Sequence, residues 1–149
     1  MTGQKMQTAS FNFWWKWLIA VAVYIIVFGL FLLMFPDLTV KGFSLLVYAD
    51  STAISGFSPM AVAYIKLVHA VLGAVMIGWA TLILFVLLNV FRQNPPLGWK
   101  LVTYSALAWF VPDTLYSLLS GFWQNAVLNL VFAVLFAVPL MALRGHVKT

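Results

Sequence analysis

The chain has 149 residues, of which 64% are hydrophobic and only 7% are charged. Typical soluble proteins are about 45–50% apolar and about 25% charged, so this chain lacks the polar side chains needed to cover a folded surface in water. The net charge is +5, but the eight basic residues are scattered along the chain, which excludes a nucleic-acid-binding domain. The composition is typical of an integral membrane protein.

Four apolar segments are each long enough to cross a bilayer as a helix, which takes about 20 residues. They cover residues 14–35, 60–89, 99–120 and 122–143. Because lipid offers no partners to the backbone, we expect helices rather than strands. The sequence therefore predicts an all-α, polytopic membrane protein, a four-transmembrane-helix bundle. No linker is long enough to separate two domains, so residues 1–149 are expected to form one.

The connections between these segments differ in character. Residues 36–59 are the longest connection, and we expect an ordered outer loop there between the first two helices. Its apolar run, residues 43–48, is too short to span and is expected in the outer interface or over the mouth of the bundle. Residues 92–98 form a tight link, because their two prolines lack backbone donors and cannot continue a helix. Residues 120–121 form a short turn.

The distribution of basic residues predicts the orientation. With a cytoplasmic amino terminus, the outer side receives Lys41, while the cytoplasmic side receives six basic residues: Lys5, Lys16, Arg92, Lys100, Arg144 and Lys148. This asymmetry fits the positive-inside rule. We expect a multi-pass protein of a bacterial inner membrane with both termini cytoplasmic.

Several polar residues interrupt the predicted spans, where an ionisable group costs about 2.5–3.5 kcal/mol and suggests function. From a rise of 1.5 Å per residue, His69, Asp113 and Asn129 all lie roughly 10–14 Å from the outer end of their helices. Their neighbours at helical spacing extend each into a polar stripe, and we expect the stripes to face one another in the outer half of the bilayer. This predicted cluster contains Lys66, His69, Asp113, Tyr116, Ser117, Asn125 and Asn129.

Each of these residues also has a purely structural interpretation. The two asparagines are often found as interhelical glue in membrane bundles, at roughly 0.6 kcal/mol each. Lys66 can extend its stem so that the ammonium reaches the outer headgroups, and His69 can be a neutral core residue with one hydrogen bond. Asp113 is too short to reach the headgroups. We expect it either to pair with Lys66 or His69, which would help to assemble the bundle, or to belong to a functional site.

The sequence lacks the motifs of most enzymes and cofactor sites. It contains no cysteine, no glycine-rich phosphate loop and no nucleophile elbow, and no second histidine or carboxylate stands at metal-ligand spacing from His69. We therefore expect neither a metal nor a cofactor. Pro112 directly precedes Asp113, so the carbonyl of Ala108 loses its helical partner beside the carboxylate.

Three functions remain open. The first is an accessory or small-ligand-binding membrane subunit, alone in the bilayer or within a homodimer or larger complex. The second is a proton-coupled carrier of a small or lipophilic solute, working as a homodimer because four helices enclose little room. The third is an enzyme on a lipid-like substrate, in which His69 acts as acid or base and Asp113 orients it. The partners expected are the lipid bilayer and a small lipophilic ligand, and we prefer the first function.

Overall fold

The computed structural model describes the backbone of residues 2–147 and the side chains of residues 8–145. Every regular element in this part of the chain is a helix. The helices are α1 (Thr2–Met34), α2 (Pro36–Tyr48), α3 (Pro59–Asn89), α4 (Pro95–Leu119) and α5 (Trp123–Val147). The all-α prediction is confirmed. Lys148 lies outside the described residues, and the side chain of Lys5 lies outside the described side chains.

Three of the helices are long and apolar enough to cross a membrane. They supply the segments Thr8–Met34, Pro59–Asn89 and Trp123–Gly145, which correspond to the first, second and fourth predicted spans. Within the described residues, α4 occupies the third predicted span and is long enough to cross a membrane, but it is less apolar than the other three helices and is not found among the candidate spans. The reason lies in its composition, since α4 contains Lys100, Asp113 and Pro112 and begins with two further prolines.

Proline and short polar residues set where three helices begin. Pro36, Pro59 and Pro95 each stand in the first turn, where the missing N–H has no helical partner to lose. Ser58 and Asn94 precede the second and third of these prolines, and their side-chain oxygens accept from the backbone N–H three residues later, at 3.2 Å in both cases. The α2–α3 and α3–α4 connections therefore end at defined residues.

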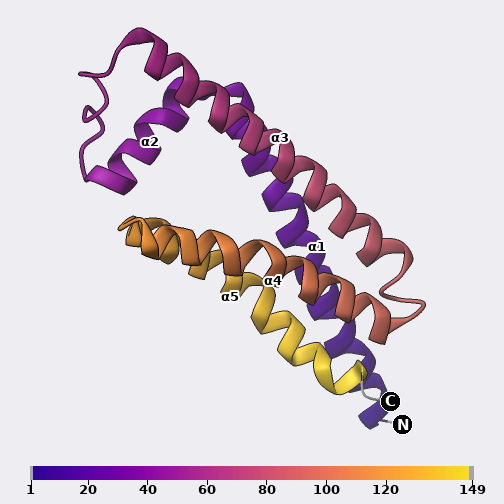
Figure 1. Ribbon diagram of the computed structural model, residues 1–149. Coiled ribbons are helices and arrows are strands. Elements are labelled where there is room, and N and C mark those ends of the chain that lie inside the picture. Colours follow the sequence, from indigo (N-terminus) through magenta and orange to yellow (C-terminus); the bar gives the residue numbers. More distant parts are fainter. Residues whose placement is uncertain (1, 148–149) are drawn as a thin grey trace.

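The helices form two antiparallel pairs that meet at one end of the molecule (Figure 1). Helices α1 and α3 lie side by side along much of their length, and α4 and α5 form a hairpin. The end where both helical termini and the α3–α4 connection lie is called the terminal end. At the opposite end, called the loop end, the two pairs diverge, and α2 lies between them.

The hydrophobic core occupies the half of the bundle near the terminal end. Its fully buried side chains come from all four long helices and include Leu18, Leu87, Val102, Phe136 and Leu143. Indole N–H groups link the helices within each pair here: Trp15 of α1 donates to the carbonyl of Leu87 of α3 at 2.9 Å, and Trp99 of α4 donates to that of Leu140 of α5 at 2.7 Å. Trp17 of α1 joins the two pairs by donating to the carbonyl of Leu135 of α5 at 3.2 Å. Because this half is packed, an internal space can form only where the pairs diverge.

Two glycines let α1 and α3 approach closely. A Cβ atom added at Gly29 would lie 2.7 Å from the carbonyl oxygen of Gly73, and one added at Gly73 would lie 2.5 Å from that of Gly29. These distances are shorter than real Cβ contacts, so the pair requires glycine at both positions. Small residues at a helix crossing favour close packing in membranes, where dispersion replaces the hydrophobic effect.

The predicted outer loop is partly a helix. Residues 36–48 form α2, and the turn-rich segment that leads to α3 covers only residues 49–58. In sequence, residues 36–59 resemble a loop, because a proline stands at each end and α2 itself is too short to span. Yet α2 has the features of a helix start: a proline in the first turn and an acidic residue, Asp37, near the positive end of the helix dipole. The predicted apolar run, residues 43–48, forms its last two turns.

Candidate functional site

A cavity of about 410 Å³ lies between the two helix pairs on the loop-end side of the core. Small-molecule sites in proteins typically measure about 300–1,000 Å³ and combine apolar walls with a few polar groups. All five helices contribute to the lining: Ile25, Phe28, Phe43, Leu72, Val75, Met76, Trp79, Ser105, Ala108, Trp109, Asp113, Asn125, Leu128, Asn129 and Phe132. Both its size and its composition fit a site for a small ligand.

Helical periodicity explains why these residues share one space. On α3 the lining residues run from Leu72 to Trp79 at spacings of three and four, and the same spacing carries α5 from Asn125 to Phe132. On α4, Trp109 and Asp113 are four residues apart, so the carboxylate and the indole stand one turn from each other on the same face. Each helix thus presents a single stripe to the cavity.

A hydrogen-bonded network joins α4 to α5 on one wall. Asn125 donates from Nδ2 to Oδ1 of Asp113 at 3.1 Å and to the hydroxyl of Ser117 at 2.8 Å. Ser117 in turn donates to the backbone carbonyl of Asp113 at 2.7 Å. One turn further along, Asn129 donates to the hydroxyl of Thr114 at 3.4 Å. These bonds fix the carboxylate at the junction of two helices.

The orientation of the Asn125 amide follows from this network. The amide nitrogen of Asn125 donates to both Asp113 and Ser117, so the amide oxygen points elsewhere. Among the described residues, no hydrogen bond reaches Oδ2 of Asp113 or the side-chain oxygen of Asn125. The wall therefore presents unoccupied acceptors beside the cavity, while both N–H groups of Asn125 are used within the network.

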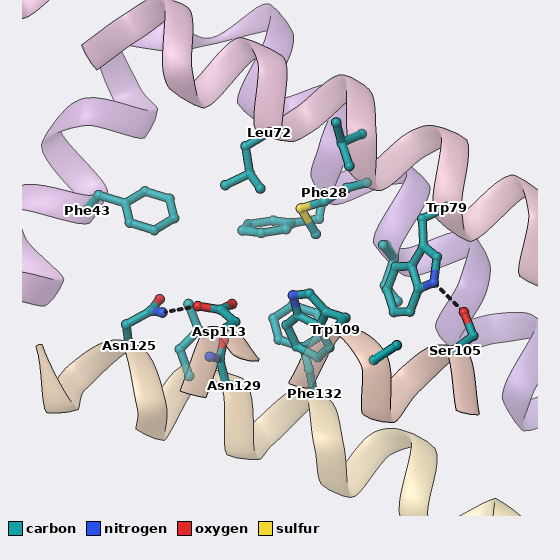
Figure 2. A pocket seen from close by; sticks show the side chains of 15 residues that line it. Phe28, Phe43, Leu72, Trp79, Ser105, Trp109, Asp113, Asn125, Asn129 and Phe132 are labelled. Carbon is teal, nitrogen blue, oxygen red and sulfur yellow. Dashed lines mark hydrogen bonds between the residues drawn. The ribbon is translucent and has the colours of Figure 1, made fainter. Parts of the chain in front are cut away.

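Aromatic rings surround the polar wall. Trp79 and Trp109 lie with ring centroids 5.7 Å apart, and Trp109 meets Phe132 edge to face at 6.1 Å. The Trp79 indole is held by a 2.6 Å hydrogen bond to Ser105 of α4. Figure 2 shows Asp113 and Asn125 next to Trp109 on the α4–α5 side, with Phe28, Leu72 and Phe43 across the cavity.

Helix α2 closes the loop end of the cavity through contacts to both pairs. Toward α3, Asp37 pairs with Lys66 at 2.6 Å, and the Phe43 ring lies 4.8 Å from the His69 ring. Toward α5, Gln124 donates to the carbonyl of Val47 at 3.0 Å, which satisfies one of the last acceptors of α2. The ammonium of Lys66 lowers the pKa of Asp37, first through its hydrogen bond and then through its charge.

The structure divides the seven residues expected to form one cluster. It brings together Asp113, Ser117, Asn125 and Asn129, with Ser117 and Asn129 almost fully buried. It does not bring in Tyr116, which is 72% exposed and does not line the cavity.

The two predicted residues of α3 face α2 instead. Lys66 pairs with Asp37, a residue of the segment that we expected to be a loop, and His69 directs Nδ1 at the carbonyl of Ile65 at 2.8 Å. Neither lines the cavity, and no hydrogen bond or ion pair among the described residues joins either of them to Asp113. The pairing of Asp113 with Lys66 or His69 is therefore replaced by pairing with Asn125.

Sequence reasoning missed the residues that complete the cavity. Thr114 is the partner of Asn129, and Phe28 and Phe43 supply the wall across from Asp113. Phe28 resembles any other apolar residue of its span, and Phe43 belongs to a segment expected to be a loop, so neither carries a signal of its own. No three His or Asp side chains in the described part of the chain are placed to hold a metal ion.

Comparison with family models, with curated proteins and with solved structures finds no match to this chain.

Proposed function

We propose that the chain is a four-span membrane protein that binds a small lipophilic ligand inside the bilayer. The observation that carries this proposal is the cavity of about 410 Å³, with aromatic walls and one hydrogen-bonded carboxylate. Apolar walls take up the body of a ligand, while a few fixed polar groups determine its orientation.

The outer surface supports a bilayer as the solvent. Large apolar side chains are exposed along every long helix, among them Val27, Phe85, Tyr104 and Val134, each at least half exposed. A water-soluble protein rarely shows apolar patches larger than a few hundred Å². Lipid removes this penalty, because acyl chains are as apolar as the side chains that meet them.

Chain connectivity supports a fourth crossing by α4. The spanning helix α3 ends at the terminal end, and the spanning helix α5 begins at the loop end (Figure 1). Helix α4 is the connection between these two ends, and its 25 residues extend about 37 Å, which exceeds the 30 Å hydrocarbon core. Its acidic residue Asp113 is turned to the cavity rather than to lipid, which reduces the cost of the crossing.

The distribution of charge supports cytoplasmic termini. Lys16, Arg92, Lys100 and Arg144 lie toward the terminal end, whereas the loop end carries Lys41 and the Asp37–Lys66 ion pair. Basic residues accumulate on the cytoplasmic side of membrane proteins. The cavity then lies in the outer half of a bacterial inner membrane.

The other two functions receive less support from the site. An enzyme that uses His69 and Asp113 together needs contact between them, and their observed partners are different residues. A carrier needs two conformational states, whereas ligand binding in this cavity needs only one.

The test uses 1-aminoanthracene, an aromatic amine that is uncharged at neutral pH, and the full chain in phosphatidylcholine nanodiscs. We expect saturable binding beyond that of empty nanodiscs, with energy transfer from Trp79 and Trp109, which line the cavity. Ala108→Phe places a large ring in the cavity and should abolish the saturable binding of 1-aminoanthracene. Ala137→Phe is the matched control, because Ala137 is exposed and does not line the cavity. Equal binding by both variants would contradict the proposal.

A further inference from the structure

We propose that the ligand of this cavity is an organic cation: an ammonium or similar charged group on an apolar body. The inference rests on the proposed binding function and adds the charge of the ligand. It is carried by a carboxylate that has no cationic partner and stands among aromatic rings.

The first step concerns charge. Asp113 is the one acidic residue of the lining, and no Lys, Arg or His side chain lines the same cavity among the described residues. On α3, across the cavity from Asp113, the lysine is Lys66, and its ammonium is paired with Asp37 at 2.6 Å. A carboxylate in a low-dielectric site gains most from an opposite charge, and within this site the ligand is the group that can bring it.

The second step concerns hydrogen bonding. The donors of Asn125 are directed at Asp113 and Ser117, so the atoms of these two side chains left for a ligand are acceptors: Oδ2 of Asp113 and the amide oxygen of Asn125. Pro112 also lacks an N–H, which leaves the carbonyl of the lining residue Ala108 without its helical donor. The indole N–H of Trp109 is a donor in the same lining, but the acceptors around the carboxylate favour a ligand that donates or is positively charged over an anion.

The third step concerns the rings. Trp109 stands one turn from Asp113 on α4, about 6 Å along the axis, and Phe132 lies in edge contact with Trp109. Ring faces attract organic cations, most strongly Trp, and the attraction grows when water is excluded. In Figure 2 the carboxylate and the Trp109 ring lie side by side on one wall, so a single charged group can reach both.

The test compares benzyltrimethylammonium with neopentylbenzene, its uncharged isostere, as competitors of 1-aminoanthracene in phosphatidylcholine nanodiscs. We expect the cation to displace the probe from the wild-type chain at a membrane concentration about tenfold or more below that of the isostere. Asp113→Asn should remove this preference and leave the affinity for the uncharged isostere within about twofold. Asp50→Asn, the same change outside the lining, should leave both affinities unchanged.

A second variant keeps the inference testable if Asp113→Asn does not fold. Trp109→Leu should weaken the binding of the cation more than the binding of the isostere. Trp109→Phe, which keeps a ring at this position, should retain part of the preference for the cation. Equal displacement by cation and isostere in the wild-type chain would overturn the cation inference while the binding function stands. Loss of the Ala108→Phe effect on 1-aminoanthracene would instead overturn the binding function itself, so the two failures are distinguishable.

Discussion

At the scale of single residues, the α4–α5 network shows what helical spacing can predict. Asp113 and Ser117 are four residues apart, as are Asn125 and Asn129, and the structure places both pairs on facing stripes. Hydrocarbon forces such groups together, because no water is present to satisfy them. The partner of each group could not be predicted, because the depth of a residue along a helix does not determine the direction in which its side chain points. Lys66 and His69 were expected near the same depth, but their side chains face α2.

Asn125 is expected to be the main polar link between α4 and α5. Asn125→Ala removes bonds to both Asp113 and Ser117 and leaves the carboxylate with fewer donors. We expect a loss of about 1–2 kcal/mol in the free energy of unfolding, measured by denaturant titration in mixed micelles. The matched control is Asn89→Ala, because exposed Asn89 bonds only to Phe85 of its own helix. Equal losses in both variants would contradict the assigned link.

At the scale of helices, hydropathy predicted the three strongly apolar elements, and it predicted a further span where the structure has the helix α4, which is less apolar than the other three. Helix α2 was missed because its 13 residues are too short to span and begin with a proline, which follows the first predicted span directly. That error propagates to the site: with residues 36–48 expected to be a loop, the natural partners of Lys66 and His69 were absent from the prediction. The closure of the cavity by Phe43 was missed for the same reason.

The α1–α3 crossing is expected to depend on glycine at position 73. Gly73→Ala places a methyl group against the backbone of α1, 2.5 Å from the Gly29 oxygen, so the helices must separate. We expect destabilisation of about 1–3 kcal/mol, measured by the same titration. Gly78→Ala on the same helix meets nothing within 4 Å and should be neutral or slightly stabilising. A neutral Gly73→Ala would show that the helices are not in close contact.

The attachment of α2 to α3 is expected to weaken in acid. The pKa of Asp37 is lowered by Lys66, so the ion pair contributes fully above the ordinary carboxyl pKa of about 4 and is lost as the pH falls through the lower folded value. Spin labels at Leu45→Cys in α2 and Leu119→Cys in α4 should give a distance distribution that broadens below that pH. Lys66→Gln should broaden it at neutral pH and remove the pH dependence. A narrow distribution in Lys66→Gln would contradict a role for the ion pair.

At the scale of the whole molecule, the path of the chain determines where the cavity lies in the membrane. If α1, α3 and α5 all cross, then α4 must cross as well, because it carries the chain from the terminal end back to the loop end. An even number of crossings places the start of α1 and the end of α5 on the same side of the membrane. The packed core then occupies one leaflet and the cavity the other, so a ligand from the lipid on the outer side reaches Asp113 without passing the core.

This topology is testable with single cysteines, since the natural chain has none. A membrane-impermeant maleimide should label Gln93→Cys, in the α3–α4 connection, from the cytoplasmic side. It should label Ser55→Cys and Ser120→Cys, at the loop end, from the outer side. Right-side-out and inverted vesicles distinguish the two sides. Labelling of Gln93→Cys and Ser120→Cys from the same side would mean that α4 does not cross the membrane, which would contradict the four-span arrangement and the proposed depth of Asp113 in the bilayer.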